Sequence, residues 1–405
     1  MTLPRELRPG RAAAAGLGLA AGTAGLGLIA TGWYCANELL VPQRAGDPYR
    51  LRVLALDPFA VTLPATEDTL QPGDATLEWI GGYGFLGPVP AQTDLGARRA
   101  LTERTGTELT PGTRVRIKRH AFNGTPAKAF GLAYTDIEVH ADLGPMPAWL
   151  VPGAPGNGSP PAGRGGTWAI LVHGRGHGRI GMLRLLPEFH RAGLTSLVIS
   201  YRNDVAAPAS PDGLYHLGDT EWFDLEAAVS EARRRGADRI VLAGDSMGAA
   251  IVLQFVQRSR LADGVAALIF DAPVLDWTAT LALAAEVRHL PGALAAVAKE
   301  IARRRISIEW DRFDQVQRAT ELRLPMLIVH GQSDTTVPLA TSQAIARRRP
   351  DLVTLVPVPG AEHAESWKVD PAGCAEAVRG FLARLGVGSS APASAARPSA
   401  EPPAS

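Results

Sequence analysis

Cysteine is scarce in this sequence. The 405 residues include two cysteines: Cys35 lies in an apolar N-terminal stretch and Cys374 in a predicted C-terminal helix. A disulfide between them is not expected, and no CxxC motif or Cys/His cluster with metal-ligand spacing is present. The sequence therefore predicts neither a disulfide scaffold nor a metal site, and no motif asks for a cofactor.

The chain also lacks an excess of charge of either sign. Its 41 Lys and Arg residues nearly balance 40 Asp and Glu residues, for a formal net charge of +1. Nucleic-acid-binding domains need a basic surface, so nucleic acid is not an expected partner. Hydrophobic residues make up 46% of the chain, enough for a large globular core. Nothing in the sequence indicates an oligomeric state.

Charge is absent altogether from residues 12–37. This run of 26 uncharged residues is longer than the ~20 helical residues that cross a bilayer, and Arg5, Arg8 and Arg11 precede it. We predict a basic cytoplasmic flank over residues 1–11 and a transmembrane signal anchor over residues 12–37. The protein would then be a single-pass protein of the cell membrane, with the residues from about 40 onward on the extracytoplasmic side. A cleaved secretory signal and a buried Ala/Gly-rich helix are the alternatives.

Two strand patterns follow. Residues 48–132 contain short apolar or alternating runs between Pro, Gly and Asp turns, which predicts a β-rich extension. Residues 133–386 open with a predicted antiparallel pair. Near-continuous apolar runs such as WAILV and RIVLA then alternate with helical stretches, a pattern typical of a doubly wound, mostly parallel α/β sheet. Residues 388–405, rich in Ala, Ser and Pro, are predicted to be a disordered tail.

The clearest catalytic motif is Gly244-Asp245-Ser246-Met247-Gly248. It directly follows the predicted strand RIVLA and directly precedes the helical run AAIVLQFVQ. A G-x-S-x-G motif in this context predicts a sharp strand-to-helix turn that exposes a serine hydroxyl, with glycines where backbones pass close together. The sequence therefore predicts Ser246 as a nucleophile.

A serine nucleophile needs a base, which is usually histidine. Three histidines follow Ser246, and His363 lies in the Gly-rich loop PVPGAEHAESW after a late predicted strand, where it can reach over the serine. His289 lies in a helical segment, and His330 ends a predicted strand. We therefore predict His363 as the base.

The acid that orients the base is expected between the serine and the histidine in the chain. Asp334 follows the predicted strand MLIV and precedes His363 by 29 residues, so it reaches the edge of the sheet where α/β sheets place their sites. Asp271, after the strand AALIF, is the alternative, and Asp276 is a weaker one.

The loop His173-Gly174-Arg175-Gly176-His177-Gly178 follows the strand WAILV. In a serine hydrolase this loop supplies one oxyanion-hole N–H, and the residue after the nucleophile supplies the other. We predict Met247 and Arg175 as the two donors, with Gly176 as the alternative to Arg175. The loop lacks the G-x-G-x-x-G spacing of a dinucleotide site.

Two further segments are predicted to cover the site. Residues 277–322 separate two predicted strands and contain two apolar helical stretches broken by Pro291-Gly292, which predicts a helical cap, the alternative being an extended crossover helix. The polar loop NDVAAPASPDGLYHLGD, after the strand LTSLVIS, is a second candidate wall.

The motifs HGRGHG, GDSMG, GQSDTTVP and GAEHAESW together resemble the α/β-hydrolase superfamily, and most closely its bacterial esterase and serine-aminopeptidase-like branches. The resemblance covers residues 133–386. It implies an eight-stranded sheet and a Ser-Asp-His triad at Ser246, Asp334 and His363.

These observations predict a carboxylic ester hydrolase that acts on a small-molecule acyl substrate through an acyl-enzyme intermediate. A serine peptidase or aminopeptidase is the alternative with the same triad. A membrane-anchored, non-catalytic binding protein is the alternative from another class.

Overall fold

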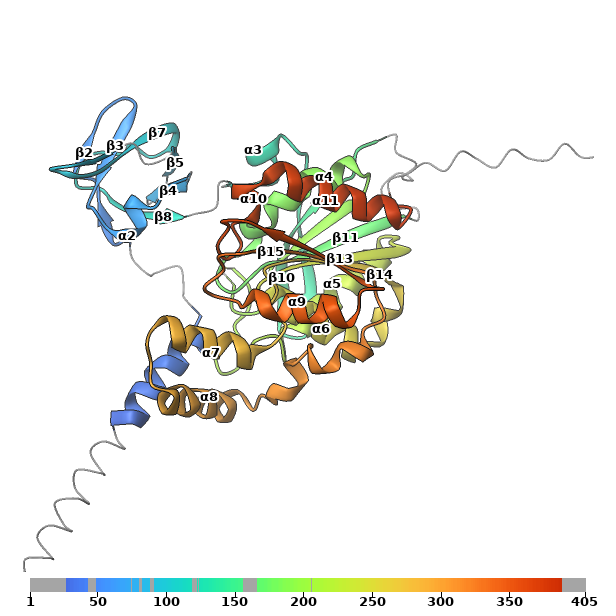
Figure 1. The fold of residues 1–405 in the computed structure, drawn as a ribbon. Coiled ribbons are helices and arrows are strands. Elements are labelled where there is room, and N and C mark those ends of the chain that lie inside the picture. The colour runs from blue at the N-terminus through green and yellow to red at the C-terminus, as the bar shows by residue number, and fades with distance from the viewer. Residues whose placement is uncertain are drawn as a thin grey trace, which may run out of the picture.

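The computed structural model describes residues 27–42, 49–73, 75–79, 82–87, 91–118, 122, 124–155, 166–204 and 206–387. Its strands form two eight-stranded sheets, one in the blue N-terminal part of the ribbon and one in the green-to-red part (Figure 1). The predicted basic flank 1–11, residues 12–26 of the predicted anchor and the predicted tail 388–405 lie outside the described residues.

The N-terminal sheet is antiparallel in every pairing and follows the order β1-β8-β4-β5-β7-β3-β2, with β6 on β7. Leu63, Leu77 and Val115 are fully buried in its own core. Its elements are β1 (Leu51–Arg52), β2 (Ala55–Leu56), β3 (Ala60–Leu63), α2 (Glu67–Leu70), β4 (Ala75–Trp79), β5 (Gly82–Leu86), β6 (Ala91–Thr93), β7 (Gly96–Gly106) and β8 (Arg114–Lys118).

The second sheet is mixed and follows the order β16-β15-β14-β13-β11-β12-β10-β9. Strand β10 pairs antiparallel with β9 and with β12, and the other pairings are parallel. Its strands are β9 (Thr135–Ala141), β10 (Gly144–Val151), β11 (Thr167–Val172), β12 (Thr195–Ile199), β13 (Arg239–Asp245), β14 (Val265–Asp271), β15 (Met326–Gly331) and β16 (Val353–Val358).

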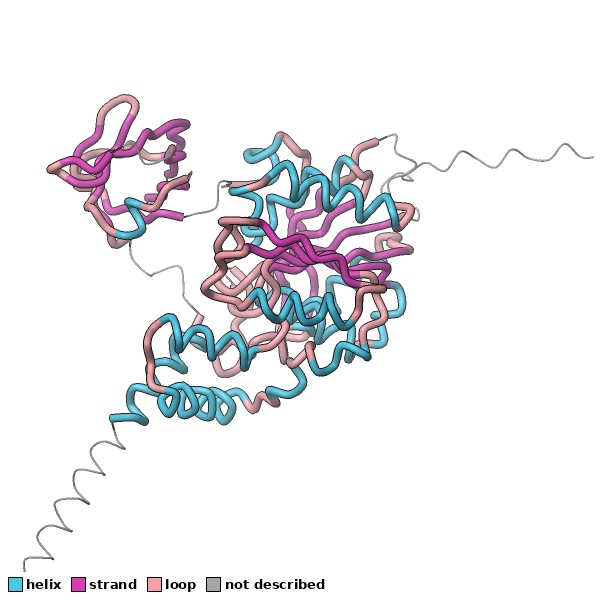
Figure 2. The backbone as a smooth tube through the Cα atoms, in the orientation of Figure 1, coloured by secondary structure: helices cyan, strands magenta, loops and turns pink. Residues whose placement is uncertain are grey.

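Helices cover both faces of this mixed sheet, as Figure 2 shows in cyan around the magenta strands. Because both faces are covered, the central strands β11 and β15 are buried almost throughout and consist mainly of apolar residues. One face carries α4 (Leu186–Arg191), α10 (Ser366–Val369) and α11 (Pro371–Arg384), and the other carries α5 (Trp222–Arg234), α6 (Met247–Arg258) and α9 (Leu339–Arg348). Shorter helices are α3 (Pro126–Phe130), η1 (Arg179–Leu185) and η2 (Arg260–Gly264).

The segment between β14 and β15 contains two longer helices, α7 (Trp277–Val287) and α8 (Gly292–Ile306), followed by η3 (Trp310–Phe313) and η4 (Gln317–Glu321). Pro291 is the N-cap residue of α8, so the helix break falls at Pro291-Gly292. Figure 1 shows α7 and α8 beside the blue N-terminal helix.

That N-terminal helix spans residues 27–40 and packs on α8. Gly32, Ala36 and Leu40 form a buried stripe at four-residue spacing, and a Cβ at Gly32 would lie 2.7 Å from a methyl of Val297. Arg305 of α8 stacks over the ring of Trp33, 4.4 Å from its centroid, and donates to the Asn37 side chain at 2.6 Å. A small-residue stripe lets the two helices approach closely.

The predicted fold class is wrong in two respects. The chain contains one antiparallel and one mixed sheet and not a mostly parallel sheet, because the strands between residues 51 and 118 form a separate antiparallel sheet and strand β10 adds antiparallel pairs to the second sheet. No helix in the described part of the chain is long and apolar enough to cross a membrane, so the transmembrane segment is not supported. The predicted extracytoplasmic location and its secreted alternative stay predictions.

Candidate active site

Ser246 forms the turn between strand β13 and helix α6. Its backbone has φ 52° and ψ −116°, a conformation that non-glycine residues adopt only where their surroundings impose it. An added Cβ on Gly244 would lie 2.7 Å from the backbone nitrogen of Ala249, and one on Gly248 would collide with the carbonyl oxygen of Val172. Only glycine fits at these two positions, so the motif is a packing requirement of the turn.

The neighbouring strand β14 fixes this turn. The N–H of Ser246 donates to the Asp271 carbonyl at 3.0 Å, and the N–H of Val274 donates to the Ser246 carbonyl at 3.1 Å. Both backbone groups of the serine are therefore satisfied, and the side chain alone is left to change partners during a reaction.

A histidine and an aspartate from two later loops complete a hydrogen-bonded row. His363 Nε2 lies 3.0 Å from Ser246 Oγ, and His363 Nδ1 lies 2.8 Å from Asp334 Oδ2. A carboxylate only accepts, so Nδ1 carries the proton, and Nε2 is left to accept from the serine hydroxyl. The structure thus brings together the three residues that the sequence places at the ends of strands β13, β15 and β16.

The carboxylate of Asp334 is fully buried and has several other donors. Its Oδ1 accepts the N–H groups of Thr336 and Val337, each at 2.8 Å. Nε2 of His330 lies 3.2 Å from Oδ2. These contacts fix the orientation of the acid before any substrate binds.

Burial shifts the pKa values of this pair, but the hydrogen bonds outweigh it. Desolvation alone would raise the pKa of Asp334, yet hydrogen bonds from His330 and His363 hold that pKa well below its usual range. Burial alone would lower the pKa of His363. The hydrogen bond and charge of Asp334, with the charges of Asp245 and Asp271, instead raise the His363 pKa above its ordinary value.

A buried ion cluster lies next to the row of three residues. Nη2 of Arg184, in η1, is 2.8 Å from Asp271 Oδ2 and 3.2 Å from Asp245 Oδ2. Nδ1 of His177 lies 3.5 Å from Asp245 Oδ2. The cluster ties the segment after the 173–178 loop to the residue before the nucleophile.

One arginine between two buried carboxylates affects each acid differently. Burial raises the pKa of Asp271, and Arg184 offsets this only in part, so the Asp271 pKa stays above its usual value. For Asp245, Arg184 and His177 outweigh burial and lower the pKa. Asp271, the second candidate for the acid, therefore pairs with Arg184, while Asp334 bonds His363.

His330, His289 and Asp276, the remaining candidates for base and acid, make contacts of a different kind. His330 is fully buried and bonds Ser342 Oγ at 2.8 Å, so it supports the acid loop. His289 is an exposed residue with φ 52° just after α7. Asp276 caps α7 by accepting the Thr278 N–H at 2.7 Å.

The loop 173–178 packs directly on the nucleophile, because a Cβ at Gly174 would lie 3.1 Å from Ser246 Cβ. His173 anchors the loop: its Nε2 lies 2.6 Å from Asp204 Oδ2 and its Nδ1 2.7 Å from the Gly174 carbonyl. Both partners are acceptors, so His173 is a buried imidazolium. Burial lowers its pKa, but Asp204 outweighs that and raises it.

The two predicted oxyanion donors lie on either side of Ser246. Met247 is the first residue of α6, where helix N–H groups have no partner within the helix. Arg175 lies in the loop beside Ser246, and its side chain turns away from the site: Nη1 donates to the Glu38 carbonyl of the N-terminal helix at 2.9 Å.

A cavity of about 1480 Å³ opens beside His363. Its walls include loop residues Gly176–Arg179, the Trp149 ring and Tyr215, together with residues of the antiparallel sheet such as Arg116 and Lys118. None of its described lining residues comes from 277–322, the predicted cap. The long loop after β12, which the sequence marks as a candidate wall, lines the cavity instead.

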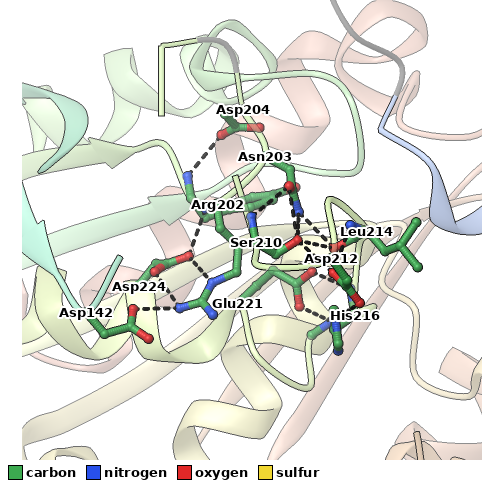
Figure 3. A network of polar contacts seen from close by, with 12 residues as sticks. Asp142, Arg202, Asn203, Asp204, Ser210, Asp212, Leu214, His216, Glu221 and Asp224 are labelled. Atoms are coloured by element: carbon green, nitrogen blue, oxygen red, sulfur yellow. Dashed lines mark hydrogen bonds and ion pairs between the residues drawn. The ribbon is translucent and has the colours of Figure 1, made fainter. Parts of the chain in front are cut away.

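A polar network holds that loop in place (Figure 3). Arg202 lies between two carboxylates, with Nε 2.8 Å from Asp224 Oδ2 and Nη2 2.8 Å from Asp142 Oδ1. Asn203, with φ 72°, donates to the carbonyl of Leu214 at 2.9 Å and so closes the loop across eleven residues.

Glu221 closes the far end of the loop. Its buried carboxylate accepts the N–H of His216 at 2.7 Å and of Gly218 at 2.9 Å (Figure 3). Burial raises its pKa although these hydrogen bonds oppose the shift. A loop held by buried hydrogen bonds and ion pairs has a defined shape, as a cavity wall requires.

Sequence reasoning missed Arg184, Asp204 and Arg202. Arg184 carries a signal: it is a lone charge inside the apolar run IGMLRLLP, and a charge buried there needs a partner. Its partners lie 61 and 87 residues further along the chain, and no local pattern reveals them.

Two parts of the chain are similar to known proteins. Residues 52–118, within the antiparallel sheet, match a family described as a domain of unknown function, DUF8805. The uncharacterized protein Rv2307c of Mycobacterium tuberculosis H37Rv is 27% identical over 231 residues, which cover 56% of this chain and 73% of that protein.

Solved structures similar to the mixed-sheet part include an esterase, Pf2001, of Pyrococcus furiosus, at 20% identity and a TM-score of 0.49 over 65% of this chain and 97% of that one. XC6422 of Xanthomonas campestris, described as an α/β serine hydrolase without lid, has 17% identity and a TM-score of 0.44 over 62% and 94%. The strand order and the turn at Ser246 are those of the α/β-hydrolase fold, so the resemblance of the motifs is confirmed at the level of the fold.

Proposed function

We propose that this chain is a serine hydrolase that cleaves a carboxylic ester of a small molecule through an acyl-enzyme intermediate. The observation that carries the proposal is the continuous row of hydrogen bonds from Asp334 through His363 to Ser246, on a turn that only glycine neighbours permit. A serine, a base and an orienting acid in this geometry are what acyl transfer needs.

In the first half of the reaction, Ser246 Oγ attacks the ester carbonyl carbon while its proton passes to His363 Nε2. The carbonyl oxygen becomes an oxyanion, for which we propose the backbone N–H groups of Met247 and Arg175 as donors. The intermediate then collapses, the C–O bond to the alcohol breaks, and Nε2 returns the proton to the leaving oxygen. In the second half, water gives a proton to Nε2 and attacks the acyl carbon. The bond from that carbon to Ser246 Oγ then breaks, Nε2 returns the proton to Oγ, and the acid leaves.

The charges around His363 support its role as a base. The imidazolium that forms in each half-reaction lies 2.8 Å from Asp334 and feels the charges of Asp245 and Asp271. These carboxylates stabilise the protonated form and so favour proton uptake from serine.

A labelling experiment tests the proposal. The protein is treated with a fluorophosphonate probe, the modified peptide is identified by mass spectrometry, and p-nitrophenyl esters of increasing chain length are assayed alongside aminoacyl amides. We expect labelling at Ser246 and ester hydrolysis. Ser246→Ala should lower kcat by about a thousandfold or more while the circular dichroism spectrum stays unchanged.

Ser230→Ala, an exposed serine on α5, is the matched control and should keep full activity. Activity of Ser246→Ala within tenfold of the wild type would refute the assignment. Amide cleavage without ester cleavage would identify a peptidase, and the absence of both labelling and hydrolysis would favour a non-catalytic binding protein.

A further inference from the structure

Arg179 is an arginine at the wall of the cavity, next to the 173–178 loop. It is the first residue after the 173–178 loop and begins η1, and it lines the same cavity as His363. Its guanidinium lies over the indole of Trp149, 4.3 Å from the ring centroid. Stacking on an aromatic face holds the guanidinium plane in one orientation and leaves its N–H edge to bind acceptors.

The N–H groups of Arg179 are not all satisfied. Nη1 is buried and has no hydrogen-bond partner among the described residues. The nearest carboxylate, Asp136, is 3.6 Å away and its side chain is 70% exposed. That distance is too long for a hydrogen bond, and an exposed partner at the protein surface contributes little.

The two other buried arginines nearby differ from Arg179. Arg184 is 2.8 Å from one aspartate and 3.2 Å from a second. Arg202 is 2.8 Å from each of two aspartates. These two arginines each lie within 3.2 Å of two carboxylates, whereas Arg179, which lines the cavity, has a carboxylate only at 3.6 Å.

Other walls of the cavity add positive charge. Lys368 lines it with its Nζ 3.5 Å from Glu365, beyond the usual length of a charged hydrogen bond. Two cavity-lining cations of the antiparallel sheet share one carboxylate, since Arg116 is 2.7 Å and Lys118 3.2 Å from Glu78. The acids Asp68, Asp204 and Glu365 also line the cavity, but its arginine and lysine residues outnumber them, so the field in the cavity favours an anion.

We propose that Arg179 binds a carboxylate group of the substrate, so that the hydrolase acts on esters that carry a negative charge on the acyl or the alcohol part. The guanidinium edge donates parallel N–H bonds to the two carboxylate oxygens, while the buried Trp149 ring holds the guanidinium in place. The proposal rests on the ester hydrolysis proposed above and adds the class of ester.

Two pairs of substrates of similar size test it, each an anionic ester with a neutral one: p-nitrophenyl hemisuccinate with p-nitrophenyl pentanoate, and 4-acetoxybenzoate with its methyl ester, assayed by release of the acetyl group. We expect the wild type to prefer the anionic member of at least one pair. Arg179→Met should lower kcat/KM for that member by about tenfold to a hundredfold, mainly through KM, and should change the neutral member less than twofold. Arg179→Lys should restore part of the loss.

Arg234→Met is the control, because Arg234 is an exposed arginine paired with Glu231 on α5, remote from the cavity lining. An equal loss on both members of each pair would show a merely structural role and overturn the proposal. So would a wild type that prefers the neutral member of both pairs.

A binding experiment separates this proposal from the proposed function. Succinate and 4-hydroxybenzoate, the carboxylate products, are titrated into Ser246→Ala and into Ser246→Ala/Arg179→Met by calorimetry. If the carboxylates bind to Ser246→Ala and bind at least tenfold more weakly to Ser246→Ala/Arg179→Met, the subsite is supported whether or not esters are hydrolysed. Equal binding to both, or binding to neither, refutes the subsite even if Ser246 is the nucleophile.

Discussion

Arg99 in the antiparallel sheet and Arg184 in η1, beside the mixed sheet, are both buried arginines, and their partners differ. In the antiparallel sheet, Arg99 is 1% exposed and donates to backbone carbonyls, with Nε 3.0 Å from the Gly87 oxygen and a further bond to Gly73. Beside the mixed sheet, Arg184 lies between the carboxylates of Asp245 and Asp271.

This difference separates two uses of a buried cation. Arg99 donates to the carbonyl oxygens of Gln71, Gly73 and Gly87, so it joins separate loops of the antiparallel sheet. Arg184 instead holds two negative charges beside Ser246 and within reach of His363, where they raise the His363 pKa. The buried arginine of the antiparallel sheet therefore holds loops together, whereas the buried ion cluster beside the mixed sheet also affects the protonation of His363.

The largest expected effect concerns the acid. Asp334→Asn should lower kcat by about ten-thousandfold, because an amide can donate to Nδ1 and so stabilise the tautomer whose Nε2–H cannot accept from Ser246. The measurement is steady-state hydrolysis of a p-nitrophenyl ester.

Asp57→Asn in the antiparallel sheet is the matched control, since Asp57 also accepts a backbone N–H, from Phe59, and pairs with Arg98. Its kcat should stay within twofold of the wild type. A comparable loss in both variants would break the distinction between the sheets, and a loss confined to Asp271→Asn would move the acid to the end of β14.

The positions of the three proposed catalytic residues follow from the sequence for a physical reason. Strands covered on both faces are uniformly apolar, so their ends are visible in the sequence, and parallel strands end at one edge of the sheet. Ser246, Asp334 and His363 each follow such a strand. The turn at Ser246 also has a local signature, because glycine is required on both sides.

Other features have no local signature. The partners of Arg184 come from two strands remote in the sequence, and single-sequence patterns carry no pairing information. The uncharged stretch 12–37 satisfies the length of a spanning helix, yet its residue Gly32 packs on α8 and Ala36 is buried. Small residues contribute little apolar area, so hydropathy and length alone cannot separate helix packing from insertion. Alternation predicts the strands of residues 48–132, but it does not predict their order.

The next effect is on stability and contrasts the two arginines directly. Arg184→Met leaves two buried aspartates without a cation and should lower the free energy of unfolding by about 3–5 kcal/mol. Arg99→Met leaves carbonyl groups unpaired and should cost about 1–3 kcal/mol. Urea unfolding followed by tryptophan fluorescence measures both.

Adding Asp271→Asn to Arg184→Met removes one of the stranded charges and should recover part of the loss. If the double variant were less stable than Arg184→Met alone, the ion pair between Arg184 and Asp271 would not stabilise the fold through charge.

A smaller effect concerns pH. His363 accepts a proton only when neutral, so kcat/KM should fall as pH falls through its pKa, and the midpoint should lie above the usual value of about 6.5 because the His363 pKa is raised. Asp245→Asn removes a negative charge that favours the imidazolium. The acid limb should then move to lower pH, by up to about one unit. If the acid limb of the kcat/KM profile moved equally in Asp57→Asn, the two sheets would not differ in their electrostatic effect on His363.

The smallest expected effect tests whether the N-terminal helix supports the loop beside Ser246. Arg175 Nη1 donates to the Glu38 carbonyl at 2.9 Å, and the Tyr215 N–H donates to the Leu40 carbonyl at 2.8 Å. Arg175→Ala keeps the backbone N–H but removes the side-chain bond, so the loop should lose some of its preferred geometry. We expect kcat to fall by about threefold to tenfold, with little change in KM, because an oxyanion donor acts in the transition state.

Arg104→Ala in the antiparallel sheet removes the same kind of contact, an arginine bond to a backbone carbonyl, since Arg104 Nη2 lies 3.2 Å from the Pro58 oxygen. Its kcat should not change. Gly32→Val should reproduce the Arg175→Ala phenotype by a different route, because the added side chain meets Val297 and Ile301 and displaces the helix from α8. If Gly32→Val and Arg175→Ala both retained full kcat, the N-terminal helix would contribute to stability and not to catalysis. If Arg104→Ala lowered kcat as well, arginine–carbonyl bonds would matter equally in both sheets.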